Sequence, residues 1–577
     1  MERKKKLFKM EYLPIYLLGL FFLWFILSFL VLPNLNVVYT TFFEKGQFSF
    51  EPFVKLFNSP RAMKSLMNSF ILAISLSITV NIVGILLVLI TEYFDIKGSR
   101  ILKLGYMTTL IYGGVVLVSG YKFIYGEGGY INNILSMILP NMNTGWFEGY
   151  WAVLFVMTFA CTSNHLIFLS NAIRKVDYQT IEASKNMGAS TFETLRKVVL
   201  PTLLPSIFAV TILIFLTGLG ATSAPLMVGG RDFQTITPMI LTFSKSAGSR
   251  DLATLLSIFL GIATIILLMI MTYFEKKGNY MSVSKVKTIM VKQKIDNKLA
   301  NIIMHIIAYI LFVIYTLPVL LIILFSFTDA KSIATRTLSF SSFSFENYKY
   351  LLMNESAYKP VLVSIIYSAL AAFGVILLVL LAARLITKYK NKWADILEYS
   401  LLIPWLLPST LIAIGMIITF DKPMWFVGNQ VLTGTLIIMF LAYLIVKIPF
   451  TLRMIKAAFF SVDDSLEEAA KNLGANSVYT FFKIILPIIL PSTLAVFALN
   501  FNTLLTDYDL SVFLYHPLFQ PLGVYIKNLT DSTGSADNTA LTLVYAVVVM
   551  IVSSLILYLV YGNKEPIKKV YKKIMNR

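Results

Sequence analysis

Long apolar runs separated by short polar stretches dominate the chain. A bilayer core about 30 Å thick requires roughly 20 apolar residues per helical span, and about twelve runs meet this length. In the first half they are expected near residues 12–33, 68–93, 104–125, 150–169, 202–221 and 252–274. In the second half they are expected near residues 302–327, 361–386, 397–420, 432–446, 488–505 and 541–561. The pattern predicts an all-α polytopic membrane protein with about twelve transmembrane helices.

Composition supports this class. Hydrophobic residues make up 57% of the 577 residues and charged residues only 14%, which is too apolar for a water-soluble surface. The first apolar run is longer than a signal-peptide core, so we expect it to be retained as a span. Cys161 is the only cysteine, which excludes an intramolecular disulfide and a cysteine-based metal site. The three histidines lie in different regions of the chain, and no metal site is expected.

The distribution of basic residues predicts the orientation. Lysine and arginine gather before the first run, between residues 276 and 298, and after the last run, whereas the loop at 126–149 carries Glu127 and Glu148 and no basic residue. Basic loops stay on the cytoplasmic side, so both termini are expected in the cytoplasm and this loop outside. The net charge of +19 therefore reflects topology and contact with membrane lipid, and no nucleic-acid partner is expected.

One segment occurs twice. The stretch from Glu182 to Pro201 recurs 286 positions later as the stretch from Glu468 to Pro487. An even number of spans between the copies returns the chain to the same side of the membrane, so the halves should form a parallel repeat about an axis along the membrane normal. We expect a first half at 1–275 with a repeated loop near 176–201, a basic cytoplasmic linker at 276–301, and a second half at 302–577 with a repeated loop near 462–487.

Each repeated loop predicts a short helix, a break and a second helix that re-enters the membrane. Asp177 and Asp463 are suited to cap the start of the first helix. Gly188 and Gly474 are suited to end it in a left-handed conformation. Such helices can simply lie on a lipid surface, but duplication favours docking to a partner that is itself a symmetric dimer.

The repeated pattern resembles the "EAA" loop of binding-protein-dependent ABC importer permeases of the type I fold. Glu-Ala-Ala, three residues, Gly, nine residues and Ile-x-Leu-Pro is matched in both copies, except for Ser184 and Val198 in the first. The resemblance implies two fused permease halves whose loops seat on cytoplasmic ATPase subunits. The coupling positions that it implies are Glu182, Ala183, Gly188, Glu468, Ala469 and Gly474.

The chain lacks the G-x-x-x-x-G-K-[ST] phosphate loop. We therefore expect no catalytic residues and no bound cofactor; ATP and Mg would be used by a separate cytoplasmic ABC ATPase dimer. The resemblance further implies an extracytoplasmic substrate-binding protein as a partner, and a location in the bacterial inner membrane.

A translocation path between the halves should be lined by polar side chains, although each such side chain can instead join helices by hydrogen bonds. The candidates are Asn164, His165, Thr217, Asn500, Asn502, Asp507 and Asp509. The fused halves and the segment from Asp507 to Leu522 resemble the ferric-iron subgroup, which implies iron(III) or a ferric complex as cargo. Thiamine, 2-aminoethylphosphonate and polyamine remain alternatives, and an ion-coupled secondary transporter is a more distant one.

Overall fold

The computed structural model describes residues 13–44, 47–141, 143–174, 176–277, 291–389, 391–460, 462–531 and 535–562. Ten helices in this part of the chain are long and apolar enough to cross a membrane, and two strongly bent helix pairs make twelve if each pair is one span. The predicted all-α polytopic class is confirmed. The basic clusters predicted at the two ends of the chain lie outside the described residues, as do positions 278–290 of the linker with Lys285 and Lys287.

The first half begins with a long helix that contains a π-helical turn and ends in a two-stranded hairpin. Its elements are α1 (Leu13–Phe25), α2 (Leu32–Phe42), β1 (Phe43–Glu44), β2 (Gln47–Phe48), α3 (Glu51–Phe57), α4 (Pro60–Val88), α5 (Ser99–Tyr106), α6 (Gly114–Tyr125), α7 (Tyr130–Ile138), α8 (Tyr150–Cys161), α9 (Ser163–Ile173), α10 (Tyr178–Asn186), α11 (Thr191–Thr194), α12 (Leu200–Leu219), α13 (Ser223–Val228), α14 (Ile236–Ser244) and α15 (Arg250–Lys277).

The second half repeats this order without the hairpin. Its elements are α16 (Lys298–Ser326), α17 (Ala330–Thr335), α18 (Glu346–Met353), α19 (Glu355–Lys388), α20 (Lys392–Leu402), α21 (Ser409–Phe420), α22 (Leu436–Phe459), α23 (Asp464–Asn472), α24 (Ser477–Thr480), α25 (Leu486–Leu505), α26 (Ser511–Leu514), α27 (Leu522–Asp531) and α28 (Ala536–Leu557).

Two predicted spans are not single straight helices. The run at 104–125 is broken between α5 and α6, and the run at 397–420 is broken between α20 and α21; the bends are 111° and 101°. Gly113 is extended and Gly114 has a φ of 53°, a conformation that favours glycine. Pro408, which precedes α21, has an extended backbone and offers no N–H for a helical hydrogen bond. Hydropathy detects apolar length but not these backbone breaks.

One span is longer than its apolar run. The run at 432–446 was expected to end the tenth span, but α22 continues to Phe459. Lys456 lies in this extension and forms an ion pair with Glu398 on α20. The ion pair compensates the charge of a lysine near the end of a membrane helix, so the helix can continue past it. A hydropathy average counts the same lysine only as a polar residue that ends the apolar run.

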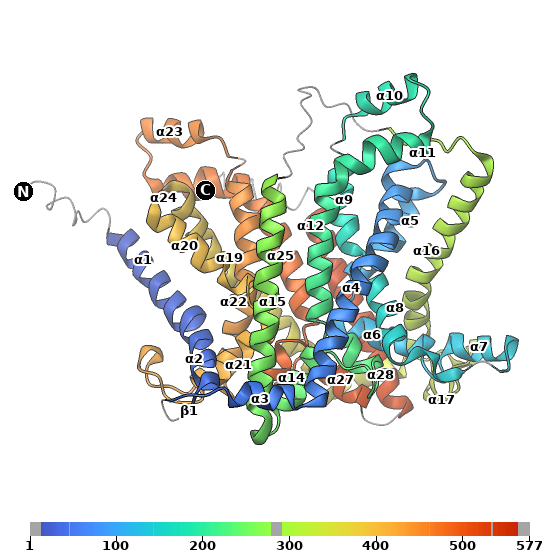
Figure 1. Cartoon of the computed structure of the whole chain (residues 1–577), viewed down its shortest axis with the longest axis horizontal. Coiled ribbons are helices and arrows are strands. Elements are labelled where there is room, and N and C mark those ends of the chain that lie inside the picture. Colours follow the sequence, from blue (N-terminus) through green and yellow to red (C-terminus); the bar gives the residue numbers. More distant parts are fainter. Residues whose placement is uncertain are drawn as a thin grey trace, which may run out of the picture.

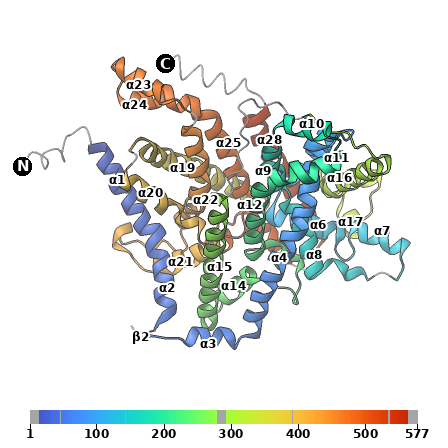
Figure 2. The ribbon, with the colours of Figure 1, turned by 45° about the horizontal axis from the view of Figure 1, so that its top comes forward.

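The repeat is visible in three dimensions. From α8 onward, most corresponding helices start 286 positions apart: α8 and α22 at Tyr150 and Leu436, and α12 and α25 at Leu200 and Leu486. The short helices α10 and α23 project from the same end of the bundle (Figure 1), as the even span count predicted. Figure 2 shows them on opposite sides of the bundle. The loop with α7 lies at the other end, which agrees with its predicted assignment to the opposite side.

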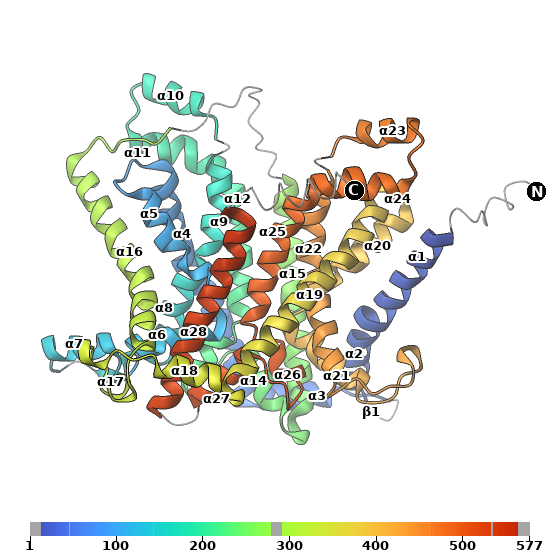
Figure 3. The same cartoon turned by 180° about the vertical axis from the view of Figure 1, so that it is seen from behind.

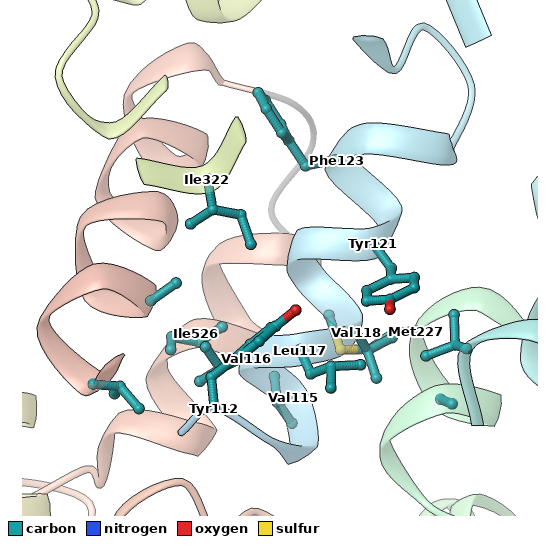
Figure 4. Close-up of a cluster of buried hydrophobic side chains, with 14 of the residues drawn as sticks. Tyr112, Val115, Val116, Leu117, Val118, Tyr121, Phe123, Met227, Ile322 and Ile526 are labelled. Carbon is teal, nitrogen blue, oxygen red and sulfur yellow. The ribbon is translucent and has the colours of Figure 1, made fainter. Parts of the chain in front are cut away.

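The first helix of each half packs on the other half. α2 lies against α21, and α16 lies against α5 and α6, as the view from behind shows (Figure 3). In Figure 4, Ile322 of α16 and Ile526 of α27 flank apolar side chains of α6. Gly120 of α6 leaves no room for a Cβ beside Ile322. Small residues allow such close helix contacts in a membrane, where van der Waals packing replaces the hydrophobic effect between helices. The two sequence halves therefore share one interlocked core.

Candidate functional site

The two repeated loops have the same backbone. In each, the short helix (α10 or α23) is followed by a second helix (α11 or α24), a π-helical turn and a long helix (α12 or α25), with all starts 286 positions apart. Pro201 and Pro487 lie just after the π-helical turns, at the start of the long helices. Proline has no N–H for the regular ladder, so a local change of helical register before it is expected.

The predicted helix ends are confirmed. The Asp177 carboxylate accepts a hydrogen bond from the N–H of Gln179 at 3.0 Å, and Asp463 accepts from the N–H of Ser465 at 2.9 Å. The glycines after the two helices are left-handed, with φ of 89° and 84°. Because these features depend on neighbouring residues only, both copies adopt the same conformation.

The tips of the repeated loops are accessible. The predicted coupling positions in the first loop, Glu182, Ala183 and Gly188, are exposed. Their counterparts in the second loop, Glu468, Ala469 and Gly474, are exposed too.

Two apolar side chains at these tips were not predicted from the sequence. Met187 is 82% exposed and Leu473 is 89% exposed, each directly before the left-handed glycine. A lone exposed apolar residue has no special meaning, but these two occupy equivalent positions in the repeat. The repeat register itself was the available signal, because it pairs position 187 with position 473.

The first repeated loop is held by the linker. The N–H and the hydroxyl of Thr191, the first residue of α11, donate to the carboxylate of Asp296 at 3.1 and 2.9 Å. The N–H of Gln293 donates to the carbonyl of Tyr93, at the end of the fourth helix, at 2.7 Å. Residues 291–297 thus form a strap that joins the end of α4, the start of α11 and the start of α16. The hydrogen bonds from Thr191 lower the pKa of Asp296.

The second repeated loop is held by charge instead. Glu467 on α23 forms a two-point ion pair with Arg384 of α19, one hydrogen bond of which measures 2.9 Å. Lys388 donates to the hydroxyl of Ser477, the first residue of α24, at 2.8 Å. At the position equivalent to Glu467, the first loop has the fully buried Ile181. Two loops with the same backbone are therefore anchored by different forces.

A cavity of about 390 Å³ lies between the halves and is lined by two of the predicted path residues, Asn164 and Thr217. The second half contributes Trp405 and Thr410, at the break between α20 and α21. The hydroxyl oxygens of Thr410 and of Thr237, on α14, are buried and have no hydrogen-bond partner among the described residues. Since no charged side chain lines this central cavity, it can offer hydroxyl, amide and aromatic contacts to a solute.

His165 is not at this cavity. Its ring is fully buried, and Nε2 lies 3.1 Å from the amide oxygen of Asn81. Gly84 packs directly against the ring. The histidine therefore fills space between α4 and α9 and joins them by a hydrogen bond, the role that is commoner for polar side chains within membrane helices.

The asparagines of α25 also join helices. The Asn500 amide donates to the Thr451 hydroxyl on α22 at 2.8 Å, and the Asn502 amide donates to the carbonyl of Ser553 on α28 at 3.5 Å. Neither residue lines the central cavity. Both contacts lie within the second half.

Asp507 and Asp509 lie in the loop between α25 and α26. Asp507 accepts a hydrogen bond from the N–H of Ser511 at 3.0 Å, which closes the turn. The Asp509 carboxylate lies beside Thr222 of the first half, and its Oδ1 atom is buried and has no hydrogen-bond partner among the described residues. Asp507 therefore stabilises the turn, and neither carboxylate lines the central cavity. The described residues contain no group of three or more His, Cys, Asp or Glu side chains able to hold a metal ion.

The similarity of this chain to known proteins reflects its internal repeat. The family described as binding-protein-dependent transport system inner membrane component matches twice, at residues 54–277 and 374–566, which together cover more than half of the chain. A Sinorhizobium fredii protein named as a probable ABC transporter permease, y4fN, is 38% identical over 93% of this chain and 94% of its own length.

Two more distant relatives differ in the cargo that their names give. The ferric transport system permease protein FbpB of Actinobacillus pleuropneumoniae is 22% identical over 88% of this chain and 72% of its own. A Salmonella typhimurium protein, PhnV, provisionally named as a 2-aminoethylphosphonate transport system permease, is 24% identical over 43% of this chain and 89% of its own. The relatives agree on a permease and disagree on the solute.

Proposed function

Because the chain belongs to the family of binding-protein-dependent transport system inner membrane components, we propose that it receives a substrate from an extracytoplasmic binding protein and moves it into the cytoplasm at the expense of ATP. The chain is a transport permease rather than an enzyme. The family assignment favours this ATP-driven class over an ion-coupled secondary transporter.

The observation that carries the coupling mechanism is the pair of exposed, identically folded loops at one end of the bundle. A cytoplasmic ATPase dimer that grips α10 and α23 would move both when its subunits close on ATP. After the left-handed glycine, each of these helices is followed by α11 or α24, which continues through a π-helical turn into a long helix, α12 or α25. α10 packs on α11 and on the π-helical turn, and α12 contributes Thr217 to the central cavity, so displacement of α10 would reach the proposed path through the helix that it packs against. Rigid-body rocking of the halves would then expose the cavity to either side in turn.

Substitution of the left-handed glycines tests the docking role. A Cβ at Gly188 or Gly474 meets no neighbouring atom, but valine there strains a backbone whose φ is 89° or 84°. A non-glycine residue in this conformation costs about 1–2 kcal/mol, more for a β-branched side chain, so each loop tip should be distorted while the core is kept. We expect the ATPase to be lost when the tagged double variant is purified from its native membrane. The variant itself should elute as the same monodisperse peak as the unaltered chain in size-exclusion chromatography. Copurification of the ATPase with the double variant would contradict the proposal.

For the cargo, we propose a ferric complex rather than bare iron(III). The similarity to a ferric permease, though distant, supports iron, and the central cavity offers hydroxyl and amide groups but no carboxylate. Bare iron(III) is a hard cation that requires anionic oxygen ligands, whereas a chelated ion presents the outer atoms of its chelator. Thiamine, 2-aminoethylphosphonate and polyamine are the alternatives.

The cargo is tested with the whole transporter. Proteoliposomes containing the chain, its ATPase and its binding protein should accumulate radioactive iron from a chelate only when ATP is present. Accumulation of thiamine, 2-aminoethylphosphonate or polyamine, with no accumulation of iron, would overturn the iron assignment and leave the importer assignment intact.

A further inference from the structure

A second cavity, distinct from the central one, lies at the end of the bundle opposite the repeated loops. It measures about 470 Å³ and is enclosed by the end of α6, the turn after α13, the end of α17 and the start of α28. Cavities of a few hundred Å³ accommodate small molecules. Unlike the central cavity, this outer cavity is lined by charged side chains of both signs.

Arg336 supplies one unsatisfied charge to this cavity. It follows α17 in a left-handed conformation, with a φ of 55°, and its guanidinium carbon lies 3.8 Å from the centre of the Phe123 ring. Its Nη1 atom is buried and has no hydrogen-bond partner among the described residues. Burial lowers the pKa of Arg336 to about 10, which leaves the group charged at neutral pH.

Arg336 lines the cavity, and no carboxylate among the described residues offsets its desolvation. A partly buried cation without an acidic partner is costly, and an anion in the cavity would offset that cost. Arg231 lines the same cavity and adds positive charge. A planar guanidinium fixed on an aromatic ring offers a preorganised contact for a carboxylate, phosphonate or phosphate group.

The cavity also contains acceptors for a cation. Glu127 and Glu148 line it. Thr539 and Thr542 of α28 line it as well, and their hydroxyls donate to carbonyls of their own helix, so their oxygen lone pairs remain as acceptors. Two carboxylates would repel a simple anion but would attract an ammonium group.

We propose that this outer cavity binds a small zwitterionic solute, with Arg336 as the contact for its anionic group and Glu127 and Glu148 as the contacts for its amine. The site is separate from the proposed path, since none of its residues lines the central cavity. It is therefore independent of which cargo crosses the membrane.

The test uses the purified full-length chain in nanodiscs, with isothermal titration calorimetry of three matched probes: 2-aminoethylphosphonate, ethylphosphonate and ethylamine. We expect 2-aminoethylphosphonate to bind most tightly. The Arg336→Gln variant should weaken it about tenfold, as expected for loss of a charge-assisted hydrogen bond. Thr410→Val, in the central cavity, is the control and should leave binding unchanged.

A second variant distinguishes the loss of a specific contact from misfolding of the chain. Replacing both Glu127 and Glu148 by glutamine should reverse the preference, so that ethylphosphonate binds more tightly than 2-aminoethylphosphonate, a gain that a misfolded chain could not show. Failure of 2-aminoethylphosphonate to bind, equal binding of ethylphosphonate to the unaltered chain, or sensitivity to Thr410→Val instead of Arg336→Gln would each overturn the proposal.

Discussion

The ion pair between Arg384 and Glu467 should control how firmly the second repeated loop is attached. Replacing Arg384 by alanine removes both hydrogen bonds to the Glu467 carboxylate. The Arg384 side chain is 16% exposed and the Glu467 side chain 35% exposed, so water can solvate the remaining carboxylate. Charge-assisted hydrogen bonds contribute about 1.5–3 kcal/mol when desolvated. After discounting for this exposure, we expect an interaction of about 1 kcal/mol.

An interaction of this size changes the ratio of attached to detached loop about fivefold. We therefore expect Arg384→Ala to lower the substrate transported per ATP hydrolysed, measured in proteoliposomes with the ATPase and the binding protein. Arginine also lowers the pKa of Glu467. The pair thus contributes stability above the unfolded pKa of this carboxyl, and the contribution is lost as the pH falls through the lower folded-state value.

A double-mutant cycle separates this ion pair from general damage. Arg384→Ala, Glu467→Ala and the double variant should show a coupling energy of about 1 kcal/mol in thermal unfolding, and the charge-reversed pair should recover part of the transport. The control is Glu355→Ala, which removes an exposed ion pair with Lys359 at the opposite end of the same helix. Additive effects of the two single variants would refute the bracing role. An equal drop in substrate transported per ATP hydrolysed in the Glu355→Ala control would refute it too.

Three further predictions concern the loop tips, the central cavity and the strap. Aspartate at both Met187 and Leu473 should abolish ATPase association in copurification while unfolding free energy changes by less than about 0.5 kcal/mol, because both side chains are exposed. Valine at Thr237 or Thr410 should not lower the thermal unfolding temperature, because neither hydroxyl has a hydrogen-bond partner among the described residues. If the hydroxyl contacts the substrate, the same substitution should slow transport about fivefold. Unchanged transport would show that these residues do not line the path. Since the hydrogen bonds from Thr191 lower the pKa of Asp296, the strap contact is stabilising above the unfolded pKa and is lost as the pH falls through the lowered value. The protection factors for hydrogen exchange at residues 291–297 should therefore fall over that acidic range in the unaltered chain and should be low at all pH values in Asp296→Ala.

The candidate site was predictable where it depends on neighbouring residues. Caps at Asp177 and Asp463 and left-handed glycines after the two short helices follow from local backbone chemistry, and all were found. Asn164 and Thr217 were found at the central cavity because polar groups within apolar runs are costly and often face the interior. The same reasoning made His165 a candidate, but in the structure it lies away from this cavity, where a buried hydrogen bond to a neighbouring helix satisfies the polar group equally well.

Other members of the site required three-dimensional information. Trp405 and Thr410 reach the central cavity only because α20 and α21 are bent by 101°. The prolines that flank this break, Pro404 and Pro408, were the available signal in the sequence. Arg336 was not singled out either, because its charge becomes unusual only when Phe123, distant in the sequence, packs against it.

The sequence by itself determined the membrane class, the parallel repeat and the two matching loops, because apolar length, span parity and helix capping are properties of contiguous residues. The tertiary structure decided how these parts are joined. It placed α2 and α16 on the opposite halves, and it braced one loop with the strap at Asp296 and the other with the ion pair at Glu467. Such contacts join residues about 80 to 400 positions apart, and the sequence pattern does not encode which distant side chains meet.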